Sequence, residues 1–347
     1  MAKTKEIDIV DGSFKEQYKR IHEYAHELLR ANPGSTVKVT SQPFQGEEES
    51  IENPQIQLNP HFQRMYIYCK ACKERFFKCR HIIGLDGCFL KGYYGGQILV
   101  AIGRDLNDLM MLIVFAVVEG ETKDSWSWFL DLLISDLGGS RICQTYTFIR
   151  ALTSNIRIVA SCGSEVMFQA MLEMKGVNEN AFEYLIKLPA RYWSKEFFKP
   201  YPLCDALVNN MLEAFNYVFV TSRDKPIITM LKEIRVYLML RWESNREKIA
   251  KFEGDILPNI KKKLAKESGR TNYWIVRLWM LTGLPSCHAM SCMKSQQLDV
   301  EKFVPDCYRK VPYEACYASV IFPVNGENLW EKKDYVELQP PPIKRQS

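Results

Sequence analysis

Three short apolar runs, separated by turn-forming residues, dominate the first half of the chain. They occupy residues 82–90, 97–102 and 110–118 and are rich in Ile, Val, Leu and Phe. Glycine-rich and Asn-Asp sequences lie between them, which is typical of strands joined by short turns. The pattern predicts an antiparallel meander of three strands.

The hydrophobic period changes directly after the third run. Apolar residues recur at helical spacing through residues 125–137, and Asp124 or Ser125 is a suitable N-cap. A weaker apolar run at 146–149 predicts a fourth strand. Three antiparallel strands, a helix and a further strand is the order in which an RNase H-like nuclease core begins. We therefore expect an α/β fold with such a core.

The flanking sequence predicts further elements around this core. Before it we expect a helix over 14–31, a strand over 37–40, a solvated acidic loop over 41–54 and a helix over 59–77. We interpret the aromatic residues of this last segment as core packing rather than a base-stacking surface.

After the fourth strand the pattern becomes largely helical and then irregular. We expect helices over 165–174, 179–187, 205–220, 226–247 and 254–268, with Pro226 at N1 of its helix after Asp224 as cap. Beyond residue 269 we expect a strand over 273–281, a helical turn over 287–293, a short helix around Tyr308, Tyr313 and Tyr317, and a disordered end from Pro340. The units implied are 1–58, 59–160, 161–268 and 269–347.

Composition and charge are those of an ordinary globular protein. The chain has 347 residues, of which 47% are hydrophobic and 25% charged, with a net charge of +5 and a pI of about 8.5. This mildly basic balance permits nucleic-acid binding without demanding it. The 11 cysteines are interpreted as reduced thiols of a cytosolic or nuclear protein. The start of the chain is polar and the longest apolar run, 109–118, is far shorter than the roughly 20 residues that cross a bilayer, so we expect no membrane partner.

Asp86 interrupts the first apolar run. A carboxylate inside a strand is costly unless it is paired or binds a cation. One reading is a ligand for Mg²⁺ in a phosphoryl-transfer site. The other is a plain aspartate at an early turn before Gly87.

Several blocks of the sequence together resemble a known family. GLDGCFLKGYYGGQILVAIGRD and FAVVEGETKDSWSWFLDLL, in that order, closely resemble the core of plant Mutator-like (MULE) transposases. The resemblance extends to residues 31–37, 184–193, 201–216, 222–241 and 281–285, and so covers most of the chain.

The resemblance implies a nuclear, DDE-type enzyme that cuts and joins DNA at terminal inverted repeats. In such enzymes three carboxylates hold two divalent cations, Mg²⁺ or Mn²⁺. Asp86 matches the first acid, and Glu213 matches the position that we take as the third. The second acid, which in the family follows the fourth strand, has no counterpart, because no Asp or Glu occurs between Asp136 and Glu165. Asp136 lies at the end of the preceding helix and is a poor substitute.

Many relatives also carry a SWIM zinc finger, with two cysteines, a spacer, and a Cys-X-His pair. Here Cys287 and His288 are adjacent, and no cysteine lies between Cys204 and Cys287. With Cys292 the module supplies at most three of the four ligands of a closed zinc site, so we expect a degenerate finger and no bound zinc. A second set, Cys69, Cys72, Cys79 and His81, has metal-like spacing, but we interpret these residues as packing residues.

Basic residues concentrate in the helical region. Arg241, Lys261, Lys262 and Lys263 are either a solvated helix face or contacts to DNA phosphates. We expect a transposase-derived, catalytically inactive protein whose partner is DNA, bound weakly. An active DDE transposase and a protein-interaction module without DNA binding are the alternatives, and self-association into a homo-oligomer is left open.

Overall fold

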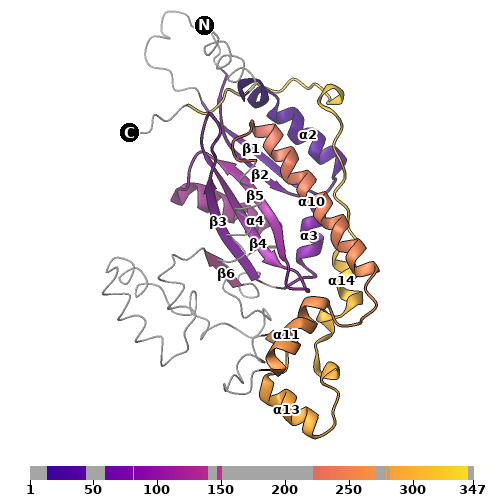
Figure 1. Cartoon of the computed structure of the whole chain (residues 1–347). Helices are drawn as coiled ribbons and strands as arrows, with labels where there is room; N and C mark the ends of the chain where they lie inside the picture. The colour runs from indigo at the N-terminus through magenta and orange to yellow at the C-terminus, as the bar shows by residue number, and fades with distance from the viewer. Residues whose placement is uncertain are drawn as a thin grey trace, which may run out of the picture.

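The computed structural model describes residues 14–43, 59–80, 82–139, 147–150, 222–269, 279 and 282–342. The expected helices over 165–174, 179–187 and 205–220 lie outside these residues. Within them the chain is a mixed α/β structure, in which one twisted sheet is flanked by helices (Figure 1).

Six strands form the sheet, in the order β1-β2-β5-β4-β3-β6. The first five pair antiparallel, and β6 pairs parallel with β3. Their bounds are β1 Thr36–Gln42, β2 His61–Tyr68, β3 Ile82–Phe89, β4 Gln97–Arg104, β5 Met110–Val118 and β6 Thr147–Arg150. The three strands of the expected meander, β3, β4 and β5, are confirmed, as are the strands expected at 37–40 and 146–149.

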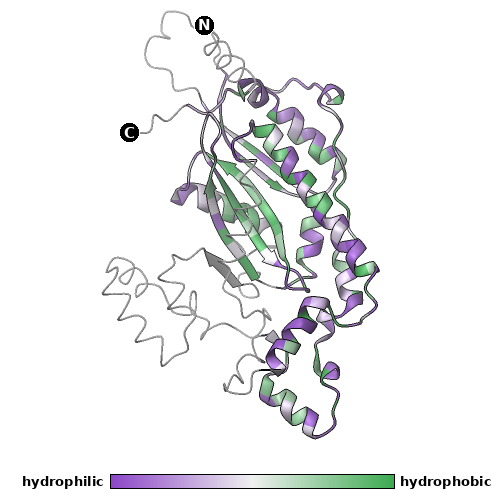
Figure 2. Ribbon diagram, viewed as in Figure 1, coloured by the Kyte–Doolittle hydropathy of each residue, from purple (hydrophilic) through white to green (hydrophobic). Residues whose placement is uncertain are grey.

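The central strands are almost continuously buried, because helices cover both faces of the sheet. β4 and β5 each have a single residue that is not fully buried. Helix α4 (Lys123–Asp136) packs on one side through Phe129 and Leu133, while α2 (Ile21–Ala31) and α10 (Ile227–Ala250) run next to each other on the other side (Figure 1). Figure 2 shows the result as a hydrophobic sheet between helices that alternate polar and apolar residues.

Helix α4 begins earlier than its sequence indicated. Thr122 is the N-cap, and neither Asp124 nor Ser125 takes that position. The Thr122 hydroxyl accepts a hydrogen bond from the Ser125 backbone N–H at 3.1 Å, and the Ser125 hydroxyl accepts one from the Thr122 N–H at 2.9 Å. This reciprocal pair satisfies two N–H groups at once, which explains why the start moves to Thr122.

The helix expected over 59–77 is wrong. The segment forms strand β2 and then the short helix α3 (Lys70–Phe76). Pairing with β1 and β5 on both edges overrides the helix reading, and the aromatic residues of β2 favour a strand. Their packing role is confirmed, since Phe62, Tyr66, Tyr68 and Phe76 are buried, although Phe77 remains 49% exposed.

Several helices outside the meander begin or end at other residues than the sequence predicted. The helix expected over 14–31 is interrupted at Arg20. Pro226 occupies the N-cap position of α10 rather than N1, so Asp224 is not its cap. Helix α11 (Pro258–Ser268) begins later than residue 254, because Pro258 occupies its first position and the preceding Leu257 is extended, as residues before proline usually are. Of the strand expected over 273–281, the described residue Trp279 is helical.

The C-terminal region packs onto the core. It contains α13 (Cys287–Ser295), η4 (Val300–Phe303), η5 (Asp306–Tyr308), α14 (Lys310–Cys316) and η6 (Glu327–Leu329). Beyond η6, Trp330 is buried against Tyr24, with ring centroids 5.6 Å apart. The disorder expected from Pro340 is wrong at the start of that segment, since the Gln339 carbonyl accepts a hydrogen bond from the Phe62 N–H at 2.8 Å and Pro340 is buried, while residues 343–347 lie outside the described part. The hydrogen bond between Phe62 and Gln339 joins residues far apart in sequence, so no local sequence pattern predicts it.

Candidate functional site

Asp86 lies near the middle of β3, at the point where the parallel strand β6 stops. The last parallel pair joins Leu85 to Arg150, and Asp86 is opposite Val100 of β4 on its other edge. The side chain is half-buried, and one carboxylate oxygen accepts a hydrogen bond from the Gly87 N–H at 2.9 Å. The predicted strand position of Asp86 is therefore confirmed, and its acid function stays a prediction.

Two nearby groups shape the surroundings of Asp86. Successive side chains of a strand alternate between faces, so Cys88 shares the face of Asp86. Burial raises the pKa of the Cys88 thiol to about 11, while Arg223 acts in the opposite direction. On the Gly87 face, a Cβ would lie 3.3 Å from the Glu121 carboxylate, which accepts a hydrogen bond from the Trp126 indole at 3.1 Å. Glu121, which the sequence did not single out, therefore lies against the face of β3 opposite to Asp86.

The other acids near the core are held by structural partners. Asp136 accepts hydrogen bonds from Thr36, Lys73 and Tyr66, at 2.7, 2.7 and 3.0 Å. The Glu119 carboxylate binds the Arg64 guanidinium. Glu213 lies outside the described residues. Within the described part of the chain, no group of three or more His, Cys, Asp or Glu side chains is placed to hold a metal ion.

The basic candidates divide into exposed and engaged side chains. Lys261 and Lys262 are exposed on α11, Lys261 with its ammonium 3.4 Å from Glu301. The Lys263 ammonium instead lies 2.6 Å from the Asp108 carboxylate. Arg241 donates a hydrogen bond to the Met110 carbonyl at 3.1 Å. The first two lysines are therefore the members of this set that are available to a phosphate backbone.

Helix α11 is fixed to the sheet at its first turn. The Asn107 carboxamide oxygen accepts a hydrogen bond from the Asn259 backbone N–H at 2.9 Å, and the Asn259 side chain donates to the Asn107 carbonyl at 3.0 Å. One N–H that a helix start leaves without an intrahelical partner is thereby satisfied from the β4–β5 turn. The exposed lysines consequently lie at a defined position relative to the core.

The cysteine candidates fall in two places. Cys287 is buried at the start of α13 and its sulfur lies 3.4 Å from the His288 Nδ1, whereas Cys292 is exposed on the same helix. In the second set Cys69, Cys72 and Cys79 are buried, as packing residues are, and His81 lies outside the described residues. The expected absence of zinc at α13 stays a prediction.

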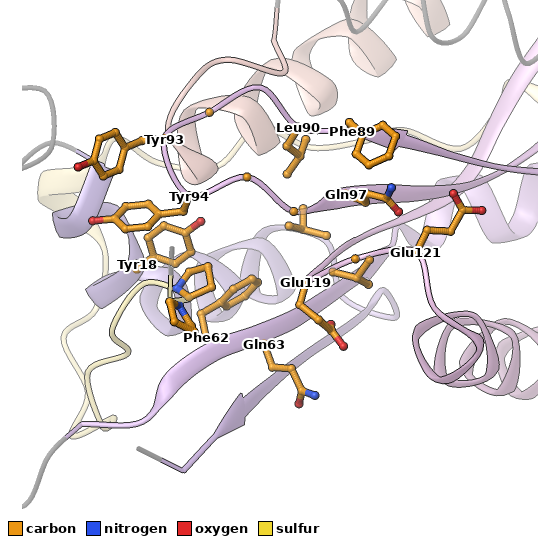
Figure 3. Close-up of a pocket in the computed structure, with 18 of the residues that line it drawn as sticks. Tyr18, Phe62, Gln63, Phe89, Leu90, Tyr93, Tyr94, Gln97, Glu119 and Glu121 are labelled. Carbon is orange, nitrogen blue, oxygen red and sulfur yellow. The ribbon is translucent and has the colours of Figure 1, made fainter. Parts of the chain in front are cut away.

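Sequence reasoning did not single out a groove of about 1020 Å³ beside the β3–β4 turn. Tyr18, Tyr93, Tyr94 and Gln97 are among the residues that line it (Figure 3). The available signal was the sequence Gly-Tyr-Tyr-Gly-Gly at 92–96, whose aromatic pair stands in a turn rather than in a strand.

Comparison with known proteins gives a family match over one part of the chain. Residues 82–159 match the model of the MULE transposase domain, a segment that contains β3, β4, β5, α4, β6 and Asp86. No curated protein and no solved structure matches the chain. The match supports a MULE family relationship and a transposase-derived function. In the described residues, no helix is long and apolar enough to cross a membrane.

Proposed function

We propose that this chain is a MULE transposase-derived, DNA-associated protein of the nucleus that has lost the catalytic activity of its family. Its core is of the RNase H type. The meander β3-β4-β5, with β6 parallel to β3 on the opposite edge, supports this assignment. The MULE domain match over the same strands supports the transposase origin.

The proposal rests mainly on one observation: Asp86 of β3 lies beside the C-terminal end of β6. The last residue of β6, Arg150, pairs with Leu85, the neighbour of Asp86, and the resemblance implies that a second metal-binding acid follows this strand. The sequence there is Ala-Leu-Thr, and the next acid is Glu165. Two divalent cations require several carboxylates to offset their mutual repulsion, so Asp86 with Glu213 is an incomplete set. Bound Mg²⁺ or Mn²⁺ would activate water or a 3′-hydroxyl in an intact site of this type.

The exposed face of α11 supports association with DNA. Lys261 and Lys262 add two exposed positive charges to a chain whose net charge is +5. Asn107 fixes the first turn of α11 through a hydrogen bond to Asn259. Contacts to phosphates alone give weak binding without sequence preference, so we expect a Kd no tighter than roughly 10⁻⁶ M near physiological salt.

A salt titration of binding to duplex DNA tests this association. The double variant Lys261→Glu, Lys262→Glu should lower the slope of log K against log salt by about 2, because each lost phosphate contact contributes about 0.9. The matched control Lys15→Glu, Lys332→Glu changes the net charge equally at exposed positions on other elements and should leave the slope near that of the unmodified chain. Nanomolar sequence-selective binding would contradict the proposal. Absence of any binding would favour the alternative of a protein-interaction module.

The retained Asp86 favours a second candidate, an active metal-dependent DDE transposase. It requires another carboxylate in place of the missing acid. Glu165 and Asp136 are the residues to mutate first if activity is found.

A further inference from the structure

The groove beside the β3–β4 turn has an aromatic wall that no part of the proposed DNA-binding role uses. Tyr18 packs on Phe62 and edge-on against Tyr94, with ring centroids 5.4 Å apart in both pairs, and Tyr93 meets Tyr94 at 5.1 Å. Two rings at the rim remain exposed, Tyr93 by 45% and Phe89 by 72%. Figure 3 shows Tyr18, Phe62, Tyr93 and Tyr94 grouped together, with Phe89 apart from them on the side of Gln97.

The turn that presents the tyrosines depends on glycine. Gly96 has a φ of +93°, and a Cβ there would lie 2.8 Å from the Val118 carbonyl oxygen. Only glycine permits both this conformation and this approach of β4 to β5. The turn therefore holds Tyr93 and Tyr94 at the groove by backbone geometry.

A buried polar group lines the same groove. Gln97 is 3% exposed, and its side-chain oxygen accepts no hydrogen bond from the residues that the structure describes. A buried acceptor without a donor is unfavourable, because it has lost its hydrogen bonds to water and has formed none within the protein. An occupant that brings an N–H group to this oxygen would remove that cost.

The charge of the groove indicates which polymer fits it. Glu119 and Glu121 lie on its wall, the Arg64 guanidinium offsets the charge of Glu119, and Lys91 is the basic residue among those that line it. Single-stranded nucleic acids also stack on aromatic rings, but they need a positively charged groove for their phosphates. A single lysine does not supply this, whereas aromatic rings beside the Glu121 carboxylate suit an apolar polypeptide segment that also carries a basic side chain.

The chain itself shows the kind of side chain that the groove accepts. Pro341 and Pro342 form part of its lining, and the preceding Pro340 carbonyl lies 2.6 Å from the Nδ1 of His61. Proline-rich segments dock in aromatic grooves because their extended conformation is formed in advance and little entropy is lost on binding. One edge of the groove is thus already built from proline rings.

We propose that this groove is a docking site for an extended, proline-rich and basic segment of a partner protein. Proline rings pack against Tyr93, Tyr94 and Phe89, a backbone N–H of the segment donates to the Gln97 oxygen, and basic side chains reach Glu121. The site is separate from the lysines of α11, so it stands independently of DNA association.

Fluorescence polarisation with the full-length chain tests the proposal. The probe is a labelled oligoproline peptide ending in arginines, and the reference is a glycine-serine peptide of the same length and charge. We expect saturable binding of the oligoproline peptide, at least about tenfold weaker binding of the reference, and about tenfold weaker oligoproline binding by Tyr93→Ala. The matched control is Tyr335→Ala, which removes a tyrosine of similar exposure, 43%, outside the groove and should bind as the unmodified chain does.

Two further variants distinguish specific binding in the groove from nonspecific binding of the peptide to the protein surface. Gln97→Leu keeps the size of the side chain and removes the acceptor, and Glu121→Gln removes a charge, so each should weaken binding while circular dichroism stays unchanged. Equal binding of both peptides, or insensitivity to Tyr93→Ala, would overturn the proposal. Two other results would also overturn it, because they would show a different occupant of the groove. The first is binding of oligothymidylate that Tyr93→Ala abolishes. The second is self-association that Tyr93→Ala abolishes when no peptide binds.

Discussion

The Arg75 guanidinium and the Asp105 carboxylate form a buried ion pair, 3.2 Å apart, with side-chain exposures of 2% and 0%. Tyr313 of helix α14 and Tyr317, the residue directly after this helix, donate to the same carboxylate at 3.2 and 2.7 Å, and Asn245 of α10 donates to Tyr317 at 2.7 Å. Four parts of the chain meet here: α3, the β4–β5 turn, α10 and α14. This cluster is the reason that the C-terminal region packs as part of the core.

Loss of Asp105 should therefore destabilise the whole described fold. Asp105→Ala leaves the buried Arg75 charge without its partner and also removes the acceptor for the Asn107 and Leu109 N–H groups. Removing one member of a buried pair typically costs about 3–5 kcal/mol of unfolding free energy. Urea denaturation measures the change. The control Asp306→Ala alters a side chain that is 95% exposed in its pair with Arg309 and should change little. A loss for Asp105→Ala no greater than for the control would contradict the role of the cluster.

Asp108 should make stability depend on pH in the acid range. Burial alone would raise the pKa of this carboxyl, but Arg80, Arg104 and Lys263 together hold it below its ordinary value. Because the folded-state pKa is depressed, the stabilisation is present above the unfolded-state pKa of about 3.9 and disappears as the pH falls below it.

The substitution Asp108→Asn isolates this charge. Asp108 has a φ of 65°, a left-handed conformation that asparagine tolerates well, so the backbone is not strained by the change. We expect a loss on the order of 2 kcal/mol near neutral pH that shrinks below about pH 4. Urea titrations at several pH values measure it, with Asp334→Asn at an exposed position as control. A loss that is equal at pH 3 and pH 7 would argue against the electrostatic cause.

The C-terminal module should hold well under one zinc ion per chain. Cys287 is buried at the first turn of α13 and Cys292 is exposed, so the two thiols of this helix do not share an environment. A closed zinc site needs four ligands. Elemental analysis of the purified protein measures the content. One tightly bound zinc that Cys287→Ser removes would show that residues outside the described part complete a site.

The meander, its helix and the position of Asp86 could be predicted because each is encoded locally. Apolar runs in β3, β4 and β5 are separated by turn residues, and the change to helical period marks α4. Strand β2 could not be recognised in the same way, because the polar residues His61, Gln63 and Arg64 interrupt its apolar run and its partners β1 and β5 are distant in sequence.

The candidate site was predictable in part for the same reason. Asp86 stands out as a charged residue in an apolar run. The engagement of Arg241 with Met110 and of Lys263 with Asp108 depends on contacts across more than a hundred residues, which composition does not reveal. The aromatic groove was missed because its wall combines residue 18, strand β2, the β3–β4 turn and the C-terminal prolines.

Metal-dependent cleavage of DNA is the measurement that tests the central claim most directly. The substrate is DNA that carries MULE terminal inverted repeats, incubated with Mg²⁺ or Mn²⁺ and followed for nicking and joining. An incomplete acid set misplaces the metals, and the resulting loss of rate should be several powers of ten, so we predict no product from the unmodified chain. A graft that restores an aspartate-bearing segment after Ile149 is the positive comparison. Cleavage by the unmodified chain that Asp86→Asn abolishes would contradict the account, because it would show that another carboxylate completes the site.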